Sequence, residues 1–373
     1  MKDHTVLLSS LKYIDEDVFA EIKNYTISSN DLYLTIAGTI GDVGLVPAEL
    51  DGANLTENAA KLTDIKCSKL YLMYVLMSSI AQDHFCSRFH QVAQPKLSLE
   101  TASSTLIPLP PYREQLRIAE GLDRWLGVVV RVEDDLSELT NYVRKTKSKI
   151  LDLAISGKLV PQDPDDEPAI EILRRINPSF KPCDNSHYEN LPQGWVKLRL
   201  GDVCSFERGI TFPSSAKCTI KQPGMIACIR TANVQDNLEL DDLWYVGNEY
   251  IKGNTEKLVR KNDIIMSSAN SRVLVGKVSY VHDLTEQMTF GGFVLNIRAN
   301  ECILHFFLFL ILRTLYLKGY YLTIATQTTN IANLNTKILG NIEVLLPPLT
   351  EQVRIINTVN KILARIDNIT AEL

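Results

Sequence analysis

Side chains able to recognise another polar molecule gather in short segments of the C-terminal half. Arg, Lys, Asn and Gln can form paired hydrogen bonds with the edges of nucleic-acid bases, while Lys, Arg, Ser and Thr suit phosphate groups. Four segments are rich in these types, and their candidate residues are Arg208, Thr211 and Lys217, then Arg230 and Asn233, then Ser267, Ser268, Asn270, Arg272 and Lys277, and finally Gln327, Thr329 and Asn330. Taken singly, each segment is more simply an exposed polar loop.

The sequence contains none of the common motifs that bind phosphate or activate a nucleophile. It lacks the G-x-x-x-x-G-K-[ST] phosphate-binding loop and the G-x-S-x-G nucleophile turn. Its six histidines are dispersed, and the acidic run at residues 165–167 has no histidine nearby, which favours a solvated loop over a metal site. We therefore expect no catalytic residue, no metal and no cofactor in this chain.

Residues 109–112 read Leu-Pro-Pro-Tyr and resemble the Pro-Pro-Tyr motif of amino-methyltransferases. Those enzymes need Asn or Asp in the first position to hold the target amine, and Leu109 cannot replace it. A related stretch at residues 346–349 also has Leu349 where the tyrosine would be. We therefore expect no methyl transfer at this position.

These two stretches belong to a ten-residue string that occurs twice, 237 positions apart. Residues 109–118 and residues 346–355 share seven of ten positions, in the pattern Leu-Pro-Pro-x-x-Glu-Gln-x-Arg-Ile. A proline pair ends an extended segment, and the Glu-Gln pair opens an amphipathic run, so each copy predicts a helix start. A unit used twice predicts a molecule with two similar halves.

Three polar residues recur in both copies of the string and need an explanation. They are Glu114, Gln115 and Arg117 in the first copy, and Glu351, Gln352 and Arg354 in the second. A structural role at the helix start is one interpretation, because a glutamate there is favoured by the helix dipole. Docking of a partner protein is the other, and the sequence leaves both open.

Each copy of the string is followed by apolar residues with a 3.5-residue period. The first seam contains Leu122, Trp125, Val129, Val132, Leu136, Leu139, Val143, Thr146, Ile150 and Leu153, and the shorter second seam runs through Ile355, Val359, Ile362, Ile366, Ile369 and Leu373. A long core-facing helix could carry such a seam, but the period favours a coiled coil. We expect the two helices to pack antiparallel, with part of the first seam left for a partner to bury.

The overall composition is that of an ordinary globular protein. The chain has 373 residues, 45% of them apolar, and a net charge of −5, so nucleic-acid binding would need a local basic face. Seven cysteines without a C-x-x-C pair favour free thiols over a disulfide frame or a zinc site. With no secretory signal and no apolar run of membrane-spanning length, the expected location is the cytoplasm, away from membranes.

The doubled string resembles the specificity subunits of type I restriction–modification systems. So do residues 157–164, Gly-Lys-Leu-Val-Pro-Gln-Asp-Pro, and residues 191–195, Leu-Pro-Gln-Gly-Trp, at the start of a domain. The resemblance implies an α+β protein with two mixed α/β target-recognition domains, joined by two long helices that form an antiparallel coiled coil. It also implies that each domain reads half of a split site in double-stranded DNA, and that the subunit itself catalyses nothing.

The resemblance also implies partners. The helices would dock modification subunits, which carry S-adenosylmethionine, and separate restriction subunits would cleave DNA. The domain boundaries expected on this basis are a partial first recognition domain at 1–111, a spacer helix at 112–156, a linker at 157–190, a second recognition domain at 191–348 and a short second spacer helix at 349–373.

The repeat extends into the globular parts but is incomplete. Residues 30–35 correspond to residues 262–267, whereas residues 191–242 have no counterpart in the first half. We therefore expect a first recognition domain without its front. The leading hypothesis is a non-catalytic DNA-specificity subunit with its reading face on the four polar segments. The alternative is a truncated subunit that acts only as an assembly module, without full site recognition.

Overall fold

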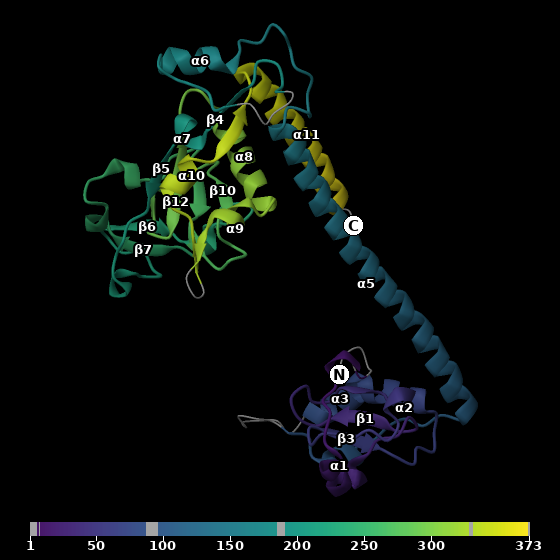
Figure 1. The fold of residues 1–373 in the computed structure, drawn as a ribbon. Helices are drawn as coiled ribbons and strands as arrows, with labels where there is room; N and C mark the ends of the chain where they lie inside the picture. Colours follow the sequence, from purple (N-terminus) through teal and green to yellow (C-terminus); the bar gives the residue numbers. More distant parts are fainter. Residues whose placement is uncertain (1–5, 7, 87–95, 185–190, 328–330, 372–373) are drawn as a thin grey trace. The chain divides into compact units, whose positions relative to one another are not determined.

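The computed structural model describes residues 6, 8–86, 96–184, 191–327 and 331–371. The chain divides into two compact units, unit 1 (Met1–Glu138) and unit 2 (Leu139–Leu373), and the boundary falls inside the long helix α5 (Tyr112–Ile155) (Figure 1). Each unit combines helices with sheets, which confirms the predicted mixed class. No helix in the described part of the chain is long and apolar enough to span a bilayer.

Unit 1 is built on a three-stranded antiparallel sheet with the strand order β2-β1-β3. Its strands are β1 (Leu32–Thr35), β2 (Val43–Leu45) and β3 (Ala59–Leu62), and its shorter helices are α1 (Glu16–Ile22), α2 (Lys69–Met77), α3 (Ser79–Cys86) and α4 (Leu99–Ser103). Successive residues of β1 point to opposite faces of the sheet. Leu32 and Leu34 pack against Leu72 of α2, whereas Tyr33 packs with a separate cluster that contains Val46.

Unit 2 contains several small sheets, helices of its own and the C-terminal part of α5. Its strands are β4 (Val196–Arg199), β5 (Cys204–Arg208), β6 (Met225–Ile229), β7 (Trp244–Gly247), β8 (Ile264–Ser267), β9 (Ala269–Asn270), β10 (Val278–Tyr280), β11 (Met288–Phe290), β12 (Val294–Ala299), β13 (Thr326–Gln327), β14 (Ala332–Asn333) and β15 (Glu343–Leu346). Its helices are α6 (Ala169–Ile176), α7 (Leu200–Val203), α8 (His305–Leu317), α9 (Tyr320–Ile324), α10 (Thr336–Gly340) and α11 (Leu349–Ala371).

The sheet β10-β8-β12-β5 forms the centre of unit 2. All four residues of β8 are buried, because α8 covers one face and the β6-β7-β11 sheet region lies beyond the other. Ile264 and Met266 pack with α8 residues such as Phe307 and Leu308, while Ile265 packs with Ile229 of β6. The apolar stretch that begins at Ile303 is too short to span a bilayer, and it forms a core helix.

The sheets of the two units share a common substructure, which extends the sequence repeat into three dimensions. Strand β1 lies antiparallel between β2 and β3, and β8 lies antiparallel between β10 and β12. The registers also correspond, because Leu32 opposes Leu45 and Leu62, while Ile264 opposes Tyr280 and Ile297. Unit 2 adds β5 beside β12, together with the β11-β6-β7 sheet.

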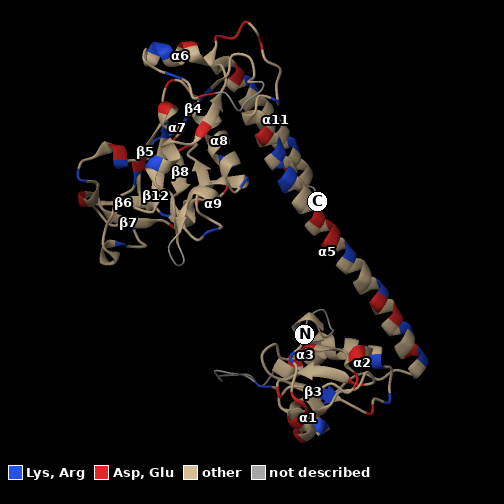
Figure 2. Cartoon of the chain, in the orientation of Figure 1, with Lys and Arg blue, Asp and Glu red and all other residues tan. Residues whose placement is uncertain are grey.

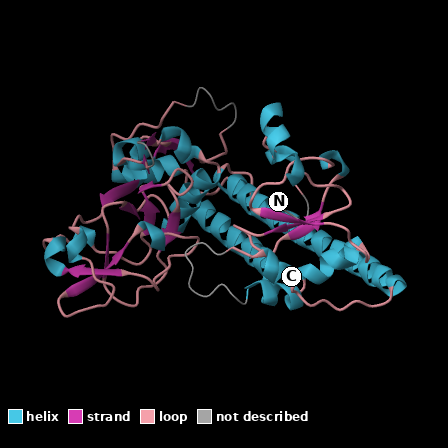
Figure 3. Cartoon of the chain, turned by 90° about the horizontal axis from the view of Figure 1, so that it is seen from below, coloured by secondary structure: helices cyan, strands magenta, loops and turns pink. Residues whose placement is uncertain are grey.

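Helix α11 packs antiparallel against the C-terminal part of α5, as the two seams predicted (Figures 1 and 3). Ile150 and Ala154 of α5 share a core cluster with Ile355 and Val359 of α11. Further from the start of α11, Lys147 forms an ion pair with Asp367. The 44 residues of α5 have a length of about 66 Å at the helical rise of 1.5 Å. The last seam position, Leu373, lies outside the described residues.

Local sequence signals fix the ends of these elements, with one exception. Gly157 ends α5 in a left-handed conformation, and a Cβ atom there would approach Pro192 to 2.6 Å, so only glycine fits. The apolar run at residues 273–278 predicts a strand from sequence, and this prediction is wrong, because residues 272–276 form turns and β10 begins only at Val278. Gly276 has a φ of +83° and breaks the extended conformation that the apolar pattern had indicated.

Candidate nucleic-acid interface

Four of the predicted DNA-contacting side chains line one cavity of about 520 Å³ in unit 2. Arg208 ends β5, Thr211 and Lys217 belong to the loop that follows, and Arg230 comes directly after β6. The loop after β5 and the turn after β6 therefore bring three cations to one place. The neighbouring Gly209 makes this possible, because a Cβ atom there would lie 2.2 Å from the Gly291 carbonyl oxygen.

The cations of this cavity differ in how firmly they are held. Arg230 pairs with the carboxylate of Asp242 and also donates to its backbone carbonyl. The Nε atom of Arg208 donates to the Gly292 carbonyl at 3.1 Å. Across the described residues, no acidic side chain forms an ion pair with Arg208 or Lys217. Two positive charges are therefore exposed and available to an anionic ligand.

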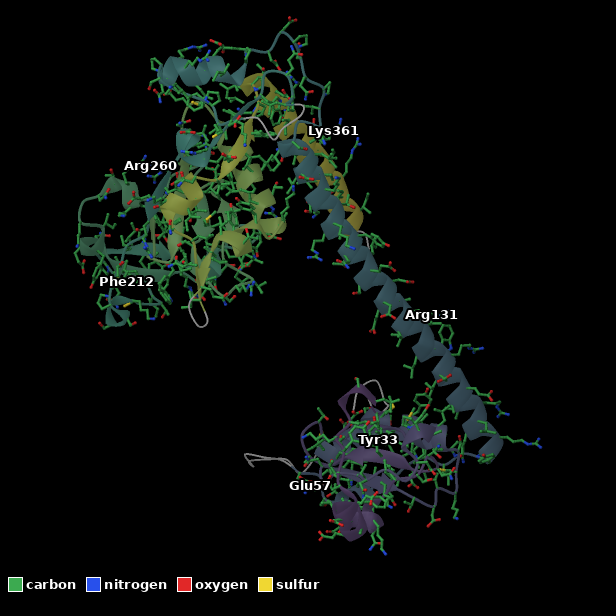
Figure 4. All side chains as sticks on the ribbon, viewed as in Figure 1. Tyr33, Glu57, Arg131, Phe212, Arg260 and Lys361 are labelled. Atoms are coloured by element: carbon green, nitrogen blue, oxygen red, sulfur yellow. The ribbon has the colours of Figure 1, made fainter. Side chains whose placement is uncertain are left out.

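Aromatic rings complete the cavity wall, and sequence reasoning missed them. Lys217 Nζ lies 4.3 Å from the centroid of the Trp244 ring, and the Arg230 guanidinium lies 5.0 Å from it. Phe212 meets Trp244 edge-on, and Figure 4 places Phe212 on the side of unit 2 where β6 and β7 lie. Phe293 is exposed at the rim. A basic residue near an aromatic one in sequence was too common a signal to single these residues out.

The thiol in this cavity is unsuited to nucleophilic chemistry. Burial raises the pKa of Cys228 to about 12, so the thiol stays protonated near neutral pH. Among the described residues no group of His, Cys, Asp and Glu side chains could hold a metal ion. The cavity therefore offers positive charge, hydrogen-bond donors and aromatic surface, which is the chemistry of nucleic-acid binding.

Three other predicted contacts are buried and have internal roles. Asn233 accepts a hydrogen bond from the Arg230 backbone at 2.9 Å and donates to the Asp242 carbonyl at 3.0 Å, so it shapes the turn that carries Arg230. Ser267 accepts from Asn270, and the Ser268 hydroxyl donates to the Phe293 carbonyl at 3.0 Å. All three side chains are buried, and Asn233 and Ser268 hold backbone groups of Arg230 and Phe293, which line the cavity.

The remaining predicted contacts are spread over neighbouring elements. Arg272 is exposed in a turn, and Lys277 donates to the side chain of Gln235. Asn270 and Gln327 belong to the small sheet β13-β14-β9, where Ala332 pairs with both. Thr329 and Asn330 lie outside the described residues. The hydrogen bond from Ser268 to Phe293 connects this sheet region to the cavity.

The two recurring glutamines make matching internal hydrogen bonds. The Gln115 side chain accepts from the Ser68 backbone N–H at 2.9 Å and donates to the Pro110 carbonyl at 2.8 Å. The Gln352 side chain accepts from the Leu304 backbone N–H at 2.8 Å and donates to the Pro347 carbonyl at 3.0 Å. Ser68 and Leu304 are the residues that precede α2 and α8. Each glutamine thus joins a long helix to a domain helix, which explains its burial and its recurrence.

The recurring acidic and basic residues have different surroundings in the two units. Glu351 is buried and accepts hydrogen bonds from Trp195 Nε1 at 2.9 Å and from Gln162 at 3.2 Å, and burial raises the pKa of its carboxyl group. Arg354 forms a bidentate ion pair with Asp166. Glu114 and Arg117 are exposed. Docking of a partner protein by the recurring polar residues stays a prediction. Glu351 is buried and could contribute to docking only by holding its neighbours in place.

Comparison with known proteins agrees with this architecture. The family model described as "Type I restriction modification DNA specificity domain" matches residues 8–136 and 192–373. The specificity subunit of the type I restriction enzyme EcoBI from Escherichia coli is 24% identical over 361 residues, covering 94% of this chain and 70% of that protein. The MjaVIII specificity subunit from Methanocaldococcus jannaschii is 23% identical over 341 residues, with coverages of 88% and 71%.

A solved structure has the same fold. A chain from a study of complex assembly and conformational transition in the type I R-M system superposes with a TM-score of 0.64 at 20% identity, and the match covers 93% of this chain and 77% of that one. The named relatives are specificity subunits, which agrees with the expectation of a component without catalytic machinery of its own. Because the family model matches most of its residues, the chain belongs to the type I restriction–modification DNA specificity family.

Proposed function

We propose that this chain supplies DNA sequence specificity to a type I restriction–modification complex, and that the cavity of unit 2 contacts the DNA. The observation that carries the proposal is the convergence of Arg208, Lys217 and Arg230 on one cavity beside Trp244. Arginine and lysine are the usual partners of guanine edges and phosphates. The net charge of −5 makes a local basic site necessary for any DNA contact.

The long helices are less suited to holding DNA. Figure 2 shows Lys and Arg interspersed with Asp and Glu along α5, so the helix has no continuous basic stripe. Its exposed seam residues, such as Trp125, Val129 and Val132, are apolar. We therefore assign DNA contact to the globular part of unit 2, and we assign docking of modification subunits, and through them restriction subunits, to the helices and their starts.

The DNA part of the proposal is tested with the chain reconstituted with its cognate modification subunits. The Arg208→Ala and Lys217→Ala variants should each weaken DNA binding by about tenfold at moderate salt and reduce the slope of log K against log salt by about one. Arg260→Ala is the matched control, since Arg260 pairs with Glu256 and lies away from Phe212 in Figure 4. Equal effects of Arg208→Ala and Arg260→Ala would reject the cavity as the contact site.

Copurification of the same complexes, measured together with DNA binding, separates this proposal from the alternative, an assembly module without full site recognition. Sequence-dependent DNA retardation together with copurification supports a working specificity subunit. Copurification with retardation that is the same for all sequences would instead support an assembly module. Failure of both would reject the proposed function as a whole.

A further inference from the structure

We propose that the exposed ring of Phe293 inserts between two neighbouring bases of the bound DNA and opens the base stack at one step. Phe293 lies at the rim of the unit 2 cavity, in the turn between β11 and β12. The inference deepens the proposed function and rests on it, because the contact forms only if the cavity binds DNA. It adds a side chain that senses how easily DNA deforms to cations that bind phosphates and base edges.

The backbone of Phe293 is held in place while its ring is exposed. Its carbonyl accepts hydrogen bonds from the N–H and the hydroxyl of Ser268, both at 3.0 Å, and from the Ala269 N–H at 3.3 Å. The ring itself is 62% exposed. A single exposed apolar side chain is common on protein surfaces. A ring on a backbone fixed by three hydrogen bonds differs, because little conformational freedom is lost when a ligand covers it.

The neighbouring residues of the turn are fixed as well. The Gly291 N–H donates to the Ile229 carbonyl of β6 at 2.9 Å, and the Val294 N–H closes the turn by donating to the Gly291 carbonyl at 2.8 Å. The Gly292 carbonyl accepts from Arg208 Nε at 3.1 Å. A side chain that separates two stacked bases works against the stacking energy of that step. The turn gives Phe293 the rigid support that such a side chain needs.

The polar surroundings of the ring favour a nucleobase over an apolar protein surface as its partner. Arg208, Thr211 and Lys217 are exposed and line the same cavity. Arg208 uses its Nε atom to hold Gly292, and its two Nη groups have no acidic partner among the residues that the structure describes. A phosphate bound by these groups would lie beside the turn that carries Phe293. Phosphates flank every base step of DNA, so a cation beside the ring suits insertion between bases.

The balance of energies makes Phe293 a specificity-determining residue. The cost of unstacking one base step and the gain from stacking bases on one aromatic ring are of similar size. Insertion is therefore favourable only where the DNA opens at low cost, and TA and CA/TG steps are the most easily opened. Phe293 thus selects sites that contain such a step, although it forms no hydrogen bond with a base.

The test is a permanganate footprint of the chain, in complex with its cognate modification subunits, on plasmid DNA that carries the methylated motif. Permanganate oxidises unstacked thymines, and every TA or CA/TG step contains a thymine. We expect one reactive step within the motif. Reactivity at the methylated base pair is set aside, because methyltransferases extrude their own target base.

Three substitutions give the comparison. Phe293→Ala should abolish the reactivity and weaken DNA binding by about tenfold, whereas Phe293→Trp should retain both. The slope of log K against log salt should stay unchanged in Phe293→Ala, because no phosphate contact is removed. Ile176→Ala is the matched control and should behave as the wild type, since Ile176 is an exposed apolar residue of α6, which lies away from β6 and β7 (Figure 1).

The outcomes separate this inference from the proposed function. DNA binding by the wild type without a reactive step outside the methylated base pair would overturn the inference by itself. Reactivity that persists in Phe293→Ala would do the same, and either result leaves the proposed function standing. Failure of the wild type to bind DNA would overturn both. Thermal unfolding verifies that Phe293→Ala is folded.

Discussion

Gln115 and Gln352 have the same structural role at the starts of α5 and α11. Each side chain satisfies a backbone N–H and a backbone carbonyl that would otherwise be buried without partners. Losing such a pair of bonds costs more than losing an exposed contact, because the orphaned groups remain desolvated. The recurrence that pointed to partner docking in the sequence therefore has a sufficient structural cause at these two positions.

A stability measurement checks this role. Gln352→Ala should lower the free energy of unfolding by about 1–3 kcal/mol, since it leaves the Leu304 N–H and the Pro347 carbonyl unpaired. Val353→Ala, at the neighbouring exposed position, should change it by less than about 0.5 kcal/mol. Urea unfolding followed by circular dichroism provides the comparison, and equal effects of the two substitutions would contradict a structural role for Gln352.

The Arg354–Asp166 pair predicts a dependence of stability on acidity. The hydrogen bond from Arg354 holds the pKa of Asp166 below its usual value of 3.8. A carboxyl group with a lowered pKa in the folded state stabilises the fold at neutral pH, and this contribution is lost as pH falls through the folded-state pKa. The Asp166→Asn variant should therefore lose less stability than the wild type as the pH falls from about 5 to about 3. Thermal unfolding of both proteins, recorded about every half pH unit, provides the comparison. Parallel curves for the two proteins would argue against the pair.

The types of the candidate DNA-contacting residues can be read from the sequence, but their exposure cannot. Arg208, Lys217 and Arg230 were identified from their chemistry, and they do share a cavity. Asn233 and Ser268 belong to the same polar segments, yet both are buried, because a turn and a rim need internal hydrogen bonds. A sequence gives the donors and acceptors of a loop, but which of them turn inward depends on tertiary contacts.

At the scale of elements, the helix pair is the feature that the sequence predicted best. The 3.5-residue period and the Pro-Pro pairs placed the starts of α5 and α11 at Tyr112 and Leu349, where the structure has them. The period also predicted a coiled coil, and the whole domain between the two seams predicted its antiparallel direction. It could not predict that the contact uses mainly Ile150, Leu151 and Ala154 near the end of α5, because that choice is made by the packing of unit 2.

Paired substitutions on the two helices test which seam positions are used within the chain. Val359→Asp should destabilise the protein by about 3 kcal/mol or more, since it places a charge in the core shared with α5. Val132→Asp should be tolerated, because Val132 is exposed on α5. Differential scanning fluorimetry of both variants gives the comparison. A larger loss for Val132→Asp would show that the exposed seam is buried within the chain in solution.

Strands were predicted less well than helices. The apolar run at residues 273–278 suggested a strand, but its residues divide between a turn and the first position of β10. Short apolar runs do not distinguish a strand from a buried turn unless the glycine conformation is known. By contrast, the correspondence between residues 30–35 and 262–267 correctly paired β1 with β8, because a repeat compares the chain with itself and needs no propensity scale.

At the scale of the whole molecule, the chain combines two related units. They share a three-stranded substructure, and unit 2 has further strands around it. Both contain a central three-stranded arrangement and a glutamine-held helix start. Unit 2 carries the basic aromatic cavity described here. The family assignment gives the general role, and the cavity gives the place at which we propose that role is performed.

The most direct test of sequence recognition is the methylation pattern of plasmid DNA propagated with this chain and its cognate modification subunits. We predict methylation confined to one sequence motif, absent when the gene for this chain is omitted, and strongly reduced in an Arg208→Ala, Lys217→Ala double variant. Methylation that is absent in all cells, or that follows the same pattern in the double variant and the wild type, would contradict a sequence-reading role for the cavity of unit 2.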